Sequence, residues 1–129
     1  MPYGYVLLGE TLLAAGKPAA AVEACEAGET KIRQRGLRLL EPEVLRVLAL
    51  AHLKGKRNFA VASDCLHRSL SAARSLGMPF LQLRALNTAY EYQGDLKLDG
   101  NALFQERQEL LKSLHAFENE PDVRMAHTH

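Results

Sequence analysis

Several residue types and patterns are scarce or missing in this chain of 129 residues, and each absence removes a class of protein. There is no tryptophan, and aromatic residues make up only 6%, whereas apolar residues reach 47%. Such a core has to rely on aliphatic side chains, which suits close packing of helices, and the chain is too apolar to be disordered. No apolar run approaches about 18 residues, the length that spans a membrane. We therefore expect one folded domain without membrane contact.

Excess charge and signals for export are absent as well. The 16 Lys plus Arg against 15 Asp plus Glu leave a net charge of +1, which offers no broad field for nucleic acid. The N-terminus lacks the basic and apolar segments of a secretory signal, so we expect a cytoplasmic protein. Cys25 and Cys65 lie in helical patterns where a small apolar residue is wanted. We expect reduced core thiols and not a disulfide.

Motifs for catalysis, metals or cofactors are also missing. The sequence has no GxxxxGK[ST] phosphate loop, no GxSxG elbow, no HExxH and no paired CxxC. His52 fits a buried helix position, and the remaining histidines are His67, His115, His127 and His129. His67 could be imagined as a base for nearby serines, namely Ser63, Ser69, Ser71 and Ser75, but helical surface residues explain them better. We expect no catalytic residue, no metal site, no cofactor and no enzymatic activity.

What the sequence does contain is a regular series of glycines between apolar stretches of helix length. These glycines are Gly16, Gly36, Gly55, Gly77 and Gly94. They predict helices over about 2–15, 18–35, 42–54, 59–76, 79–93 and 101–117, with Asn58 capping the fourth. In the first helix the apolar stripe is Tyr5, Leu8, Leu12 and Ala15. The pattern predicts an all-α chain of helical hairpins.

Three of these helices share a pattern roughly 40 residues apart, which indicates an internal repeat. Tyr5-x-x-Leu8-Gly9-x-x-Leu12 aligns with Leu45-x-x-Leu48-Ala49-x-x-His52 and with Leu83-x-x-Leu86-Asn87-x-x-Tyr90. Gly16, Ala21, Cys25 and Gly28 keep the spacing at which tetratricopeptide repeats place a turn glycine and alternating small and bulky residues. Small residues let two helices approach closely, while large ones fill the groove between hairpins. Asn87 departs from the small residue that this repeat prefers.

The chain resembles the tetratricopeptide repeats, and the span from Tyr5 to Gly94 is similar to the C-terminal repeat region of bacterial signalling ATPases, class III adenylyl cyclases and ATP-dependent transcriptional activators. The strings that carry this likeness are Glu43-Val44-Leu45-Arg46, Ala62-Ser63-Asp64-Cys65-Leu66-His67-Arg68-Ser69-Leu70 and Leu81-Gln82-Leu83-Arg84-Ala85. The resemblance implies a right-handed α-α superhelix of about three hairpins and six helices, with repeats at about 2–36, 42–77 and 79–117 and a flexible tail at 118–129. It implies a sensor or docking arm whose catalytic or DNA-binding partners lie in other domains.

The repeat register places one set of side chains toward the concave groove of such a superhelix. The set comprises Val6, Glu10, Arg46, Leu50, Arg84, Thr88 and Glu91, with apolar contact expected from Tyr3, Leu7 and Leu81. Arg46 and Arg84 occupy equivalent places, where two guanidinium groups could bind a carboxylate or an acidic peptide. The alternative is that both are ordinary surface charges, paired with Glu43 and Glu10.

Two further readings stay open beside a groove that binds a protein or peptide. The apolar face of the first helix has no cover, so the end helices could pair in a homodimer without an external ligand. The segment from Asp95 to Glu106 also approaches an EF-hand loop, with Asp at positions 1 and 5, Gly at 6 and Glu at 12. Lys97 stands at the third position, where calcium needs an oxygen ligand. A plain loop in which Asp99 or Asn101 caps the next helix explains this segment better.

Overall fold

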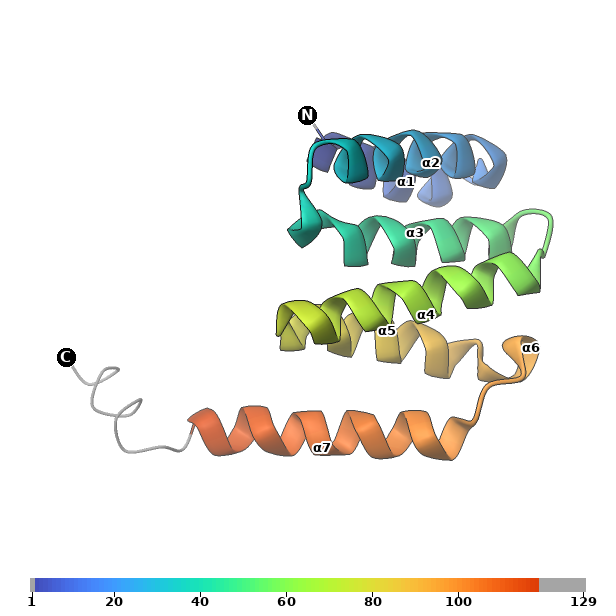
Figure 1. The fold of residues 1–129 in the computed structure, drawn as a ribbon. Helices are drawn as coiled ribbons and strands as arrows, with labels where there is room; N and C mark the ends of the chain where they lie inside the picture. Colours follow the sequence, from blue (N-terminus) through green and yellow to red (C-terminus); the bar gives the residue numbers. More distant parts are fainter. Residues whose placement is uncertain (1, 119–129) are drawn as a thin grey trace.

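A computed structural model describes residues 2–118 of the chain, and for Pro2, Tyr3, Phe117 and Glu118 it describes the backbone alone. Over these residues the chain consists of helices joined by short loops and contains no strand (Figure 1). The elements are α1 (Pro2–Ala14), α2 (Pro18–Gln34), the 3-10 turn η1 (Arg38–Leu40), α3 (Glu41–Lys54), α4 (Phe59–Leu76), α5 (Pro79–Glu91), α6 (Gln93–Leu96) and α7 (Gly100–Glu118). The all-α prediction is confirmed. The expected six helices are joined by the short α6, and Glu118, assigned to the tail, belongs to α7.

Most helix ends follow the local signals in the sequence. Gly16, Gly36 and Gly77 have φ of 74°, 66° and 63°, so each takes the left-handed conformation that ends a helix. Asn58 caps α4 by accepting a hydrogen bond from the Val61 amide at 3.4 Å. The expected end at Gly94 is displaced, because α5 already ends at Glu91 and Gly94 lies inside α6. The left-handed residue there is Lys97, with φ of 53°.

Consecutive long helices pack side by side from one end of the molecule to the other (Figure 1). Each long helix contacts the next, in the order α1, α2, α3, α4, α5 and α7. Contacts also join α1 to α3 and α3 to α5. The first, third and fifth long helices therefore form a row of their own, and side chains on their outer surface can meet across hairpin boundaries.

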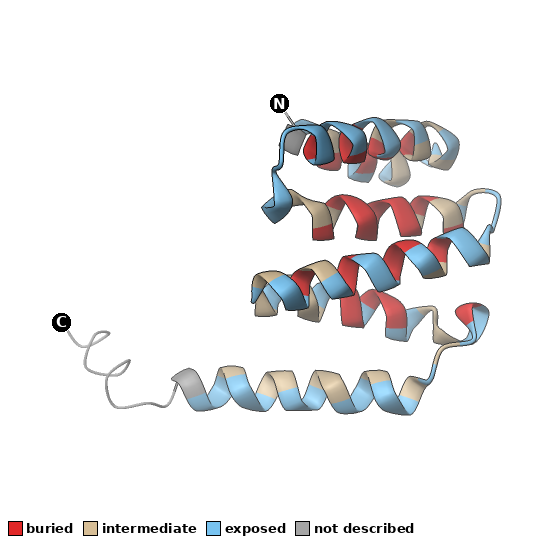
Figure 2. Cartoon of the chain, viewed as in Figure 1, coloured by how far each residue is buried: buried red, intermediate tan, exposed pale blue. Residues whose placement is uncertain are grey.

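The core is centred on α3 (Figure 2). From Val44 to Ala49 every residue of this helix is buried, because α1, α2, α4 and α5 all contact it. At α1 the expected apolar stripe is wrong in part: Tyr5 and Leu12 are half-buried, but Leu8 is 47% exposed, and Val6 is buried instead at 3% exposure. Apolar residues surround most of α1, so the packing of its neighbours selects its inner face. Because Val6 is buried in this way, it does not line the expected groove.

Two glycines allow the first hairpin and α3 to approach closely. A Cβ at Gly9 would lie 2.5 Å from Cys25 Sγ and 3.1 Å from Val47 Cγ1, and a Cβ at Gly28 would lie 2.5 Å from Tyr5 Cβ. Real Cβ atoms are not found at such short distances, so these positions require glycine at this helix spacing. The expected role of small residues at Gly9 and Gly28 is confirmed.

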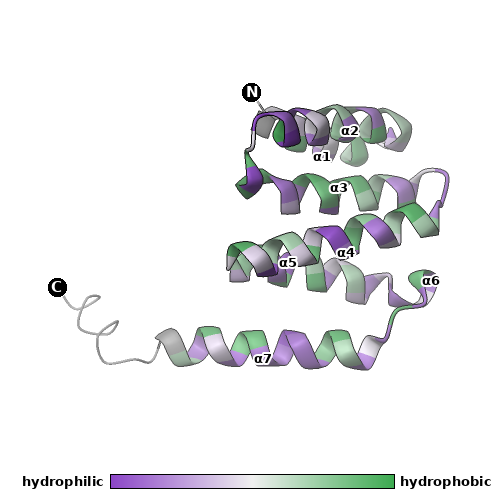
Figure 3. Cartoon of the chain, viewed as in Figure 1, coloured by the Kyte–Doolittle hydropathy of each residue, from purple (hydrophilic) through white to green (hydrophobic). Residues whose placement is uncertain are grey.

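Helix α7 packs more loosely than the other long helices. None of its described side chains, from Gly100 to Ala116, is fully buried, and the expected inward leucines are only partly covered. These are Leu103, Leu110, Leu111 and Leu114. Hydrophobic and hydrophilic bands succeed one another along this helix (Figure 3). Helix α7 thus covers α5 without forming a closed core of its own.

Candidate partner-binding face

Three of the expected groove residues are joined through Glu43 and Arg46. Glu10 comes from α1, Arg46 from α3 and Arg84 from α5; Glu43 pairs with both arginines, and Glu10 pairs with Arg46. An Arg46 Nη lies 3.0 Å from a Glu43 Oε and 3.7 Å from a Glu10 Oε, and an Arg84 Nη lies 3.5 Å from the same Glu43 oxygen. We call these four residues the ionic cluster. It links the three helices that form the row on this side.

The members of the ionic cluster differ in their access to solvent. The side chains of Arg46 and Glu43 are 11% and 13% exposed, whereas those of Glu10 and Arg84 are 43% and 53% exposed. A buried pair is costly to break because the remaining charge is left without compensation, whereas an exposed pair contributes little. Arg46 and Glu43 therefore form the fixed part, and Arg84 and Glu10 are the side chains free to exchange partners.

Arg46 keeps one hydrogen-bond donor unused. Its Nε is buried and has no partner among the described residues. A buried donor without a partner costs roughly 1–3 kcal/mol. An acceptor supplied from outside, such as a carbonyl or carboxylate oxygen, would remove this cost if it reached the ionic cluster.

The other expected groove residues divide into available and unavailable ones. Leu50 is half-buried one turn after Arg46, and Glu91 is exposed. Thr88 is 7% exposed, and its hydroxyl donates to the Arg84 carbonyl of its own helix at 3.1 Å. The Tyr3 side chain lies outside the described residues, whereas Leu7 is 50% exposed and Leu81 is half-buried. Thr88 was expected to project toward the groove, but it is buried in its own helix's inner surface and offers little area to a partner.

The sequence interpretation treated Glu43 only as an alternative partner for the arginines. The structure places its carboxylate between Arg46 and Arg84, where a partner's carboxylate was expected. The signal was present in the sequence, because Glu43 precedes Arg46 by three positions on one helix face. The cluster holds two acidic and two basic residues, so its formal charges cancel.

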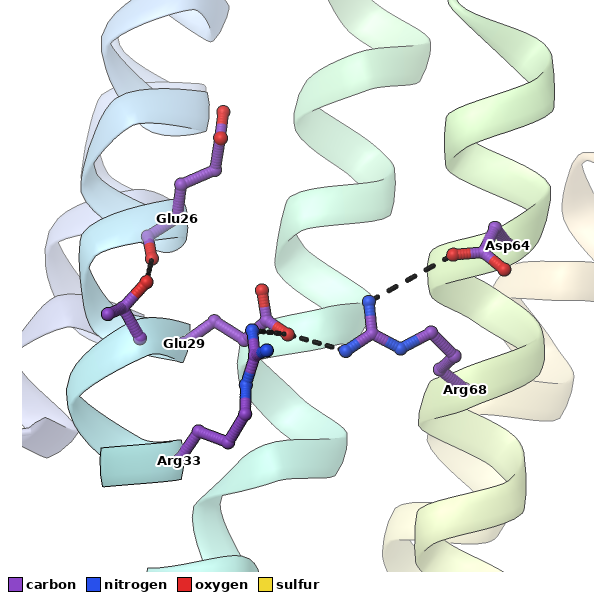
Figure 4. Close-up of polar contacts among 6 residues, drawn as sticks. Glu26, Glu29, Arg33, Asp64 and Arg68 are labelled. Carbon is purple, nitrogen blue, oxygen red and sulfur yellow. Dashed lines mark hydrogen bonds and ion pairs between the residues drawn. The ribbon is translucent and has the colours of Figure 1, made fainter. Parts of the chain in front are cut away.

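A second set of charges lies on α2 and α4 (Figure 4). Glu29 is 8% exposed, and one of its carboxylate oxygens accepts hydrogen bonds from Arg33 at 2.8 Å and from Arg68 at 2.5 Å. Arg68 also lies 3.9 Å from Asp64. Hydrogen bonding to Glu29, opposed by burial, raises the pKa of Arg68. All charged groups here are matched inside the chain, so the set ties the second helices of two hairpins together.

The calcium alternative does not fit the geometry. Asp99 caps α7 by accepting from the amides of Asn101 and Ala102 at 3.1 and 3.2 Å, and Glu106 binds Arg74 and Gln82. Asp95 lies within α6. No group of three potential metal ligands occurs among the described residues, which exclude His127 and His129. The plain capped loop is confirmed.

Both cysteines are unpaired and buried. Burial is the main cause that raises the pKa of Cys25 to about 11 and that of Cys65 to about 11. A thiol must lose its proton to act as a nucleophile, so such values keep both groups unreactive near neutral pH. They serve here as small core residues.

No family model, curated protein or solved structure matches this chain. In the part of the chain that the structure describes, no helix is both long enough and apolar enough to cross a membrane.

Proposed function

We propose that this chain is a protein-interaction module with a tetratricopeptide-like superhelical fold and no reaction of its own. It acts as a docking or sensor arm of a bacterial signalling or transcriptional regulator in the cytoplasm. The partner is a peptide or protein segment that lies along the row formed by α1, α3 and α5. The observation that supports this proposal most directly is the ionic cluster, in which side chains from three hairpins meet on one face.

The burial of the cluster suggests how such a partner binds. Arg46 stays with Glu43, while the exposed Arg84 exchanges its long contact with Glu43 for a carboxylate of the partner. Arginine suits this role because its fork can hold a carboxylate through two hydrogen bonds. Leu50 and Glu91 lie on the same helices and supply an apolar contact and a polar edge. An acidic peptide with an apolar neighbour is the expected ligand.

The test selects peptides from a random library on the immobilised protein and compares variants. Arg84→Ala should weaken selected acidic peptides about tenfold, the loss expected for one charge-assisted contact. Arg33→Ala is the matched control, because Arg33 is 66% exposed on α2 and pairs with Glu29. Arg46→Ala requires a stability measurement first, since it leaves Glu43 buried without its close partner. If the selected peptides bind the Arg84→Ala protein as tightly as the original protein, the row of α1, α3 and α5 is not the binding face.

A second candidate function is self-association through the end helices. Leu7 and Leu8 on α1 are 50% and 47% exposed, and Phe104 on α7 at the other end is 46% exposed. Light scattering after chromatography, over a hundredfold dilution, separates the two candidates. A dimer that dissociates on Leu8→Lys favours this function, and a monomer at every concentration excludes an obligate dimer.

A further inference from the structure

The ionic cluster alternates in sign along its contacts. In order from α1 to α5 its members are Glu10, Arg46, Glu43 and Arg84, and each contacts the next. The inner two share a hydrogen bond of 3.0 Å, in which Arg46 Nη2 donates to Glu43 Oε2. The outer contacts, at 3.7 Å for Glu10 and 3.5 Å for Arg84, are longer than hydrogen bonds between charged groups. The chain therefore fixes the middle of the cluster and holds its two ends only weakly.

The two ends of the cluster keep their hydrogen-bonding capacity. No hydrogen bond joins the Glu10 carboxylate or the Arg84 guanidinium to another of the described residues. Both side chains are exposed, whereas the inner pair is nearly covered. A partner that lies on this face thus meets an unused acceptor on α1 and an unused donor on α5.

The two ends lie within reach of a short peptide segment. The same Arg46 nitrogen contacts Glu10 and Glu43, and the same Glu43 oxygen contacts Arg46 and Arg84. The Glu10 oxygen and the Arg84 nitrogen can therefore be no farther apart than these three contacts laid end to end. An extended peptide advances about 3.3 Å per residue, so two of its side chains span that distance when they are about two or three positions apart.

Net charge does not attract a ligand to this face, because the two acids and two bases of the cluster cancel. A segment that is only acidic would satisfy Arg84 but would be repelled by Glu10, and a segment that is only basic would meet the reverse. A segment with one charge of each sign can satisfy both ends and continues the alternation. The arrangement of charges, and not their sum, is the property that this face can recognise.

We infer, on the basis of the proposed function, that the partner segment carries one basic and one acidic residue about two or three positions apart. We call this pair the two-charge motif. The basic residue binds Glu10 on α1, and the acidic residue binds Arg84 on α5. Glu43 and Arg46 stay paired between them. The acidic residue expected from Arg84 alone is thus only half of the recognised motif.

Peptides selected from a random library on the immobilised protein test this inference. They should carry Lys or Arg within about three positions of Asp or Glu. One such peptide is then made in two forms, with its basic residue kept or replaced by glutamine. The glutamine form should bind the original protein about fivefold more weakly, the loss expected for one exposed ion pair. Selected peptides without a basic residue would overturn the inference.

The variant Glu10→Gln shows where the basic residue binds. The two peptide forms should bind this variant equally well, because the partner of the basic residue has lost its charge. The glutamine form should bind the variant at least as tightly as it binds the original protein, which shows that the variant is folded. Glu26→Gln is the matched control, because Glu26 is exposed on α2 and lies outside the ionic cluster. The difference between the two peptide forms should persist in this control.

Arg84→Ala separates a failure of the two-charge motif from a failure of the proposed function. If Arg84→Ala weakens the selected peptides while Glu10→Gln leaves the difference between the two peptide forms intact, the two-charge motif is wrong and the acidic ligand remains. If neither variant changes binding, or if no peptide is selected, both are wrong.

Discussion

Arg107 of α7 donates a hydrogen bond to Asn87 of α5, with Nε 2.8 Å from Oδ1. In the first hairpin the aligned position of Asn87 is Gly9, which lies so close to Cys25 of α2 that no Cβ fits. The third hairpin thus replaces a tight apolar contact by a polar one. The contact is exposed, and no described side chain of α7 is fully buried.

We expect an apolar contact at this position to strengthen α7. The double variant Asn87→Ala with Arg107→Leu should be as stable as the original or more stable by about 1 kcal/mol, because both polar partners are removed together. Urea unfolding of the double variant and of each single variant measures this. Single variants that each lose stability, with a double variant that loses no more than either of them, would show that the hydrogen bond itself holds α7.

Gly28 should not tolerate even one additional carbon atom. Gly28→Ala places a Cβ 2.5 Å from Tyr5 Cβ, and we expect a loss of about 1–3 kcal/mol in the free energy of unfolding. Gly4→Ala is the matched control, because Gly4 lies in α1 with no atom near its Cβ position. That change should be neutral or slightly stabilising, since alanine favours helices. Equal effects of the two changes in thermal melts would contradict the close packing of α1 and α2.

The docking of α7 should weaken in acid. Burial opposes ionisation of Glu106, but hydrogen bonds from Arg74 and Gln82 outweigh it and hold the pKa of this carboxyl below its usual value. Its contribution is therefore complete above the unfolded pKa of about 4.3 and is lost as the pH falls through the lower folded value. Hydrogen exchange of the α7 amides, corrected for intrinsic rates, should rise in that range.

Glu106→Gln is the control for this effect. It should raise α7 exchange at neutral pH and remove most of the acid-dependent increase. The expected cost is about 0.5–1 kcal/mol, because Arg74 is 48% exposed and solvent screens the pair. An acid-dependent increase that persists unchanged in this variant would assign the effect to another group.

Glu29 should matter more for stability than its neighbour Glu26. Glu29→Gln weakens charged hydrogen bonds to Arg33 and Arg68 in a site that is 8% exposed, and we expect a loss of about 1–3 kcal/mol. Glu26 is exposed, and Glu26→Gln should change stability by no more than about 0.5 kcal/mol. Urea unfolding compares the two. Similar small effects would show that Arg68 does not tie α4 to α2.

The two thiols should resist modification while the chain is folded. With pKa values of about 11 for Cys25 and for Cys65, thiolate is scarce at pH 8, and burial hinders access of a reagent. Reaction with a disulfide reagent should be slow in buffer and rapid in urea, where both thiols titrate normally. Rapid modification of either thiol in buffer would contradict its burial.

Local signals in the sequence were sufficient for the helices and most of their ends. Gly16, Gly36 and Gly77 end helices because glycine adopts positive φ without strain, and Asn58 caps α4 through its own side chain. These effects act within a few residues, so they can be predicted without knowing the neighbours. The repeat register also predicted that Glu10, Arg46 and Arg84 lie on the same side of the molecule.

Only the tertiary structure decided which face of each helix is covered and which charges pair. Apolar residues surround most of α1, and the contacts with α2 and α3 selected Val6 for the core and left Leu8 exposed. Likewise, Glu43 holds both Arg46 and Arg84 because α3 and α5 pack side by side. Burial and ion pairing depend on atoms far apart in the chain, and the local pattern of one helix does not specify them.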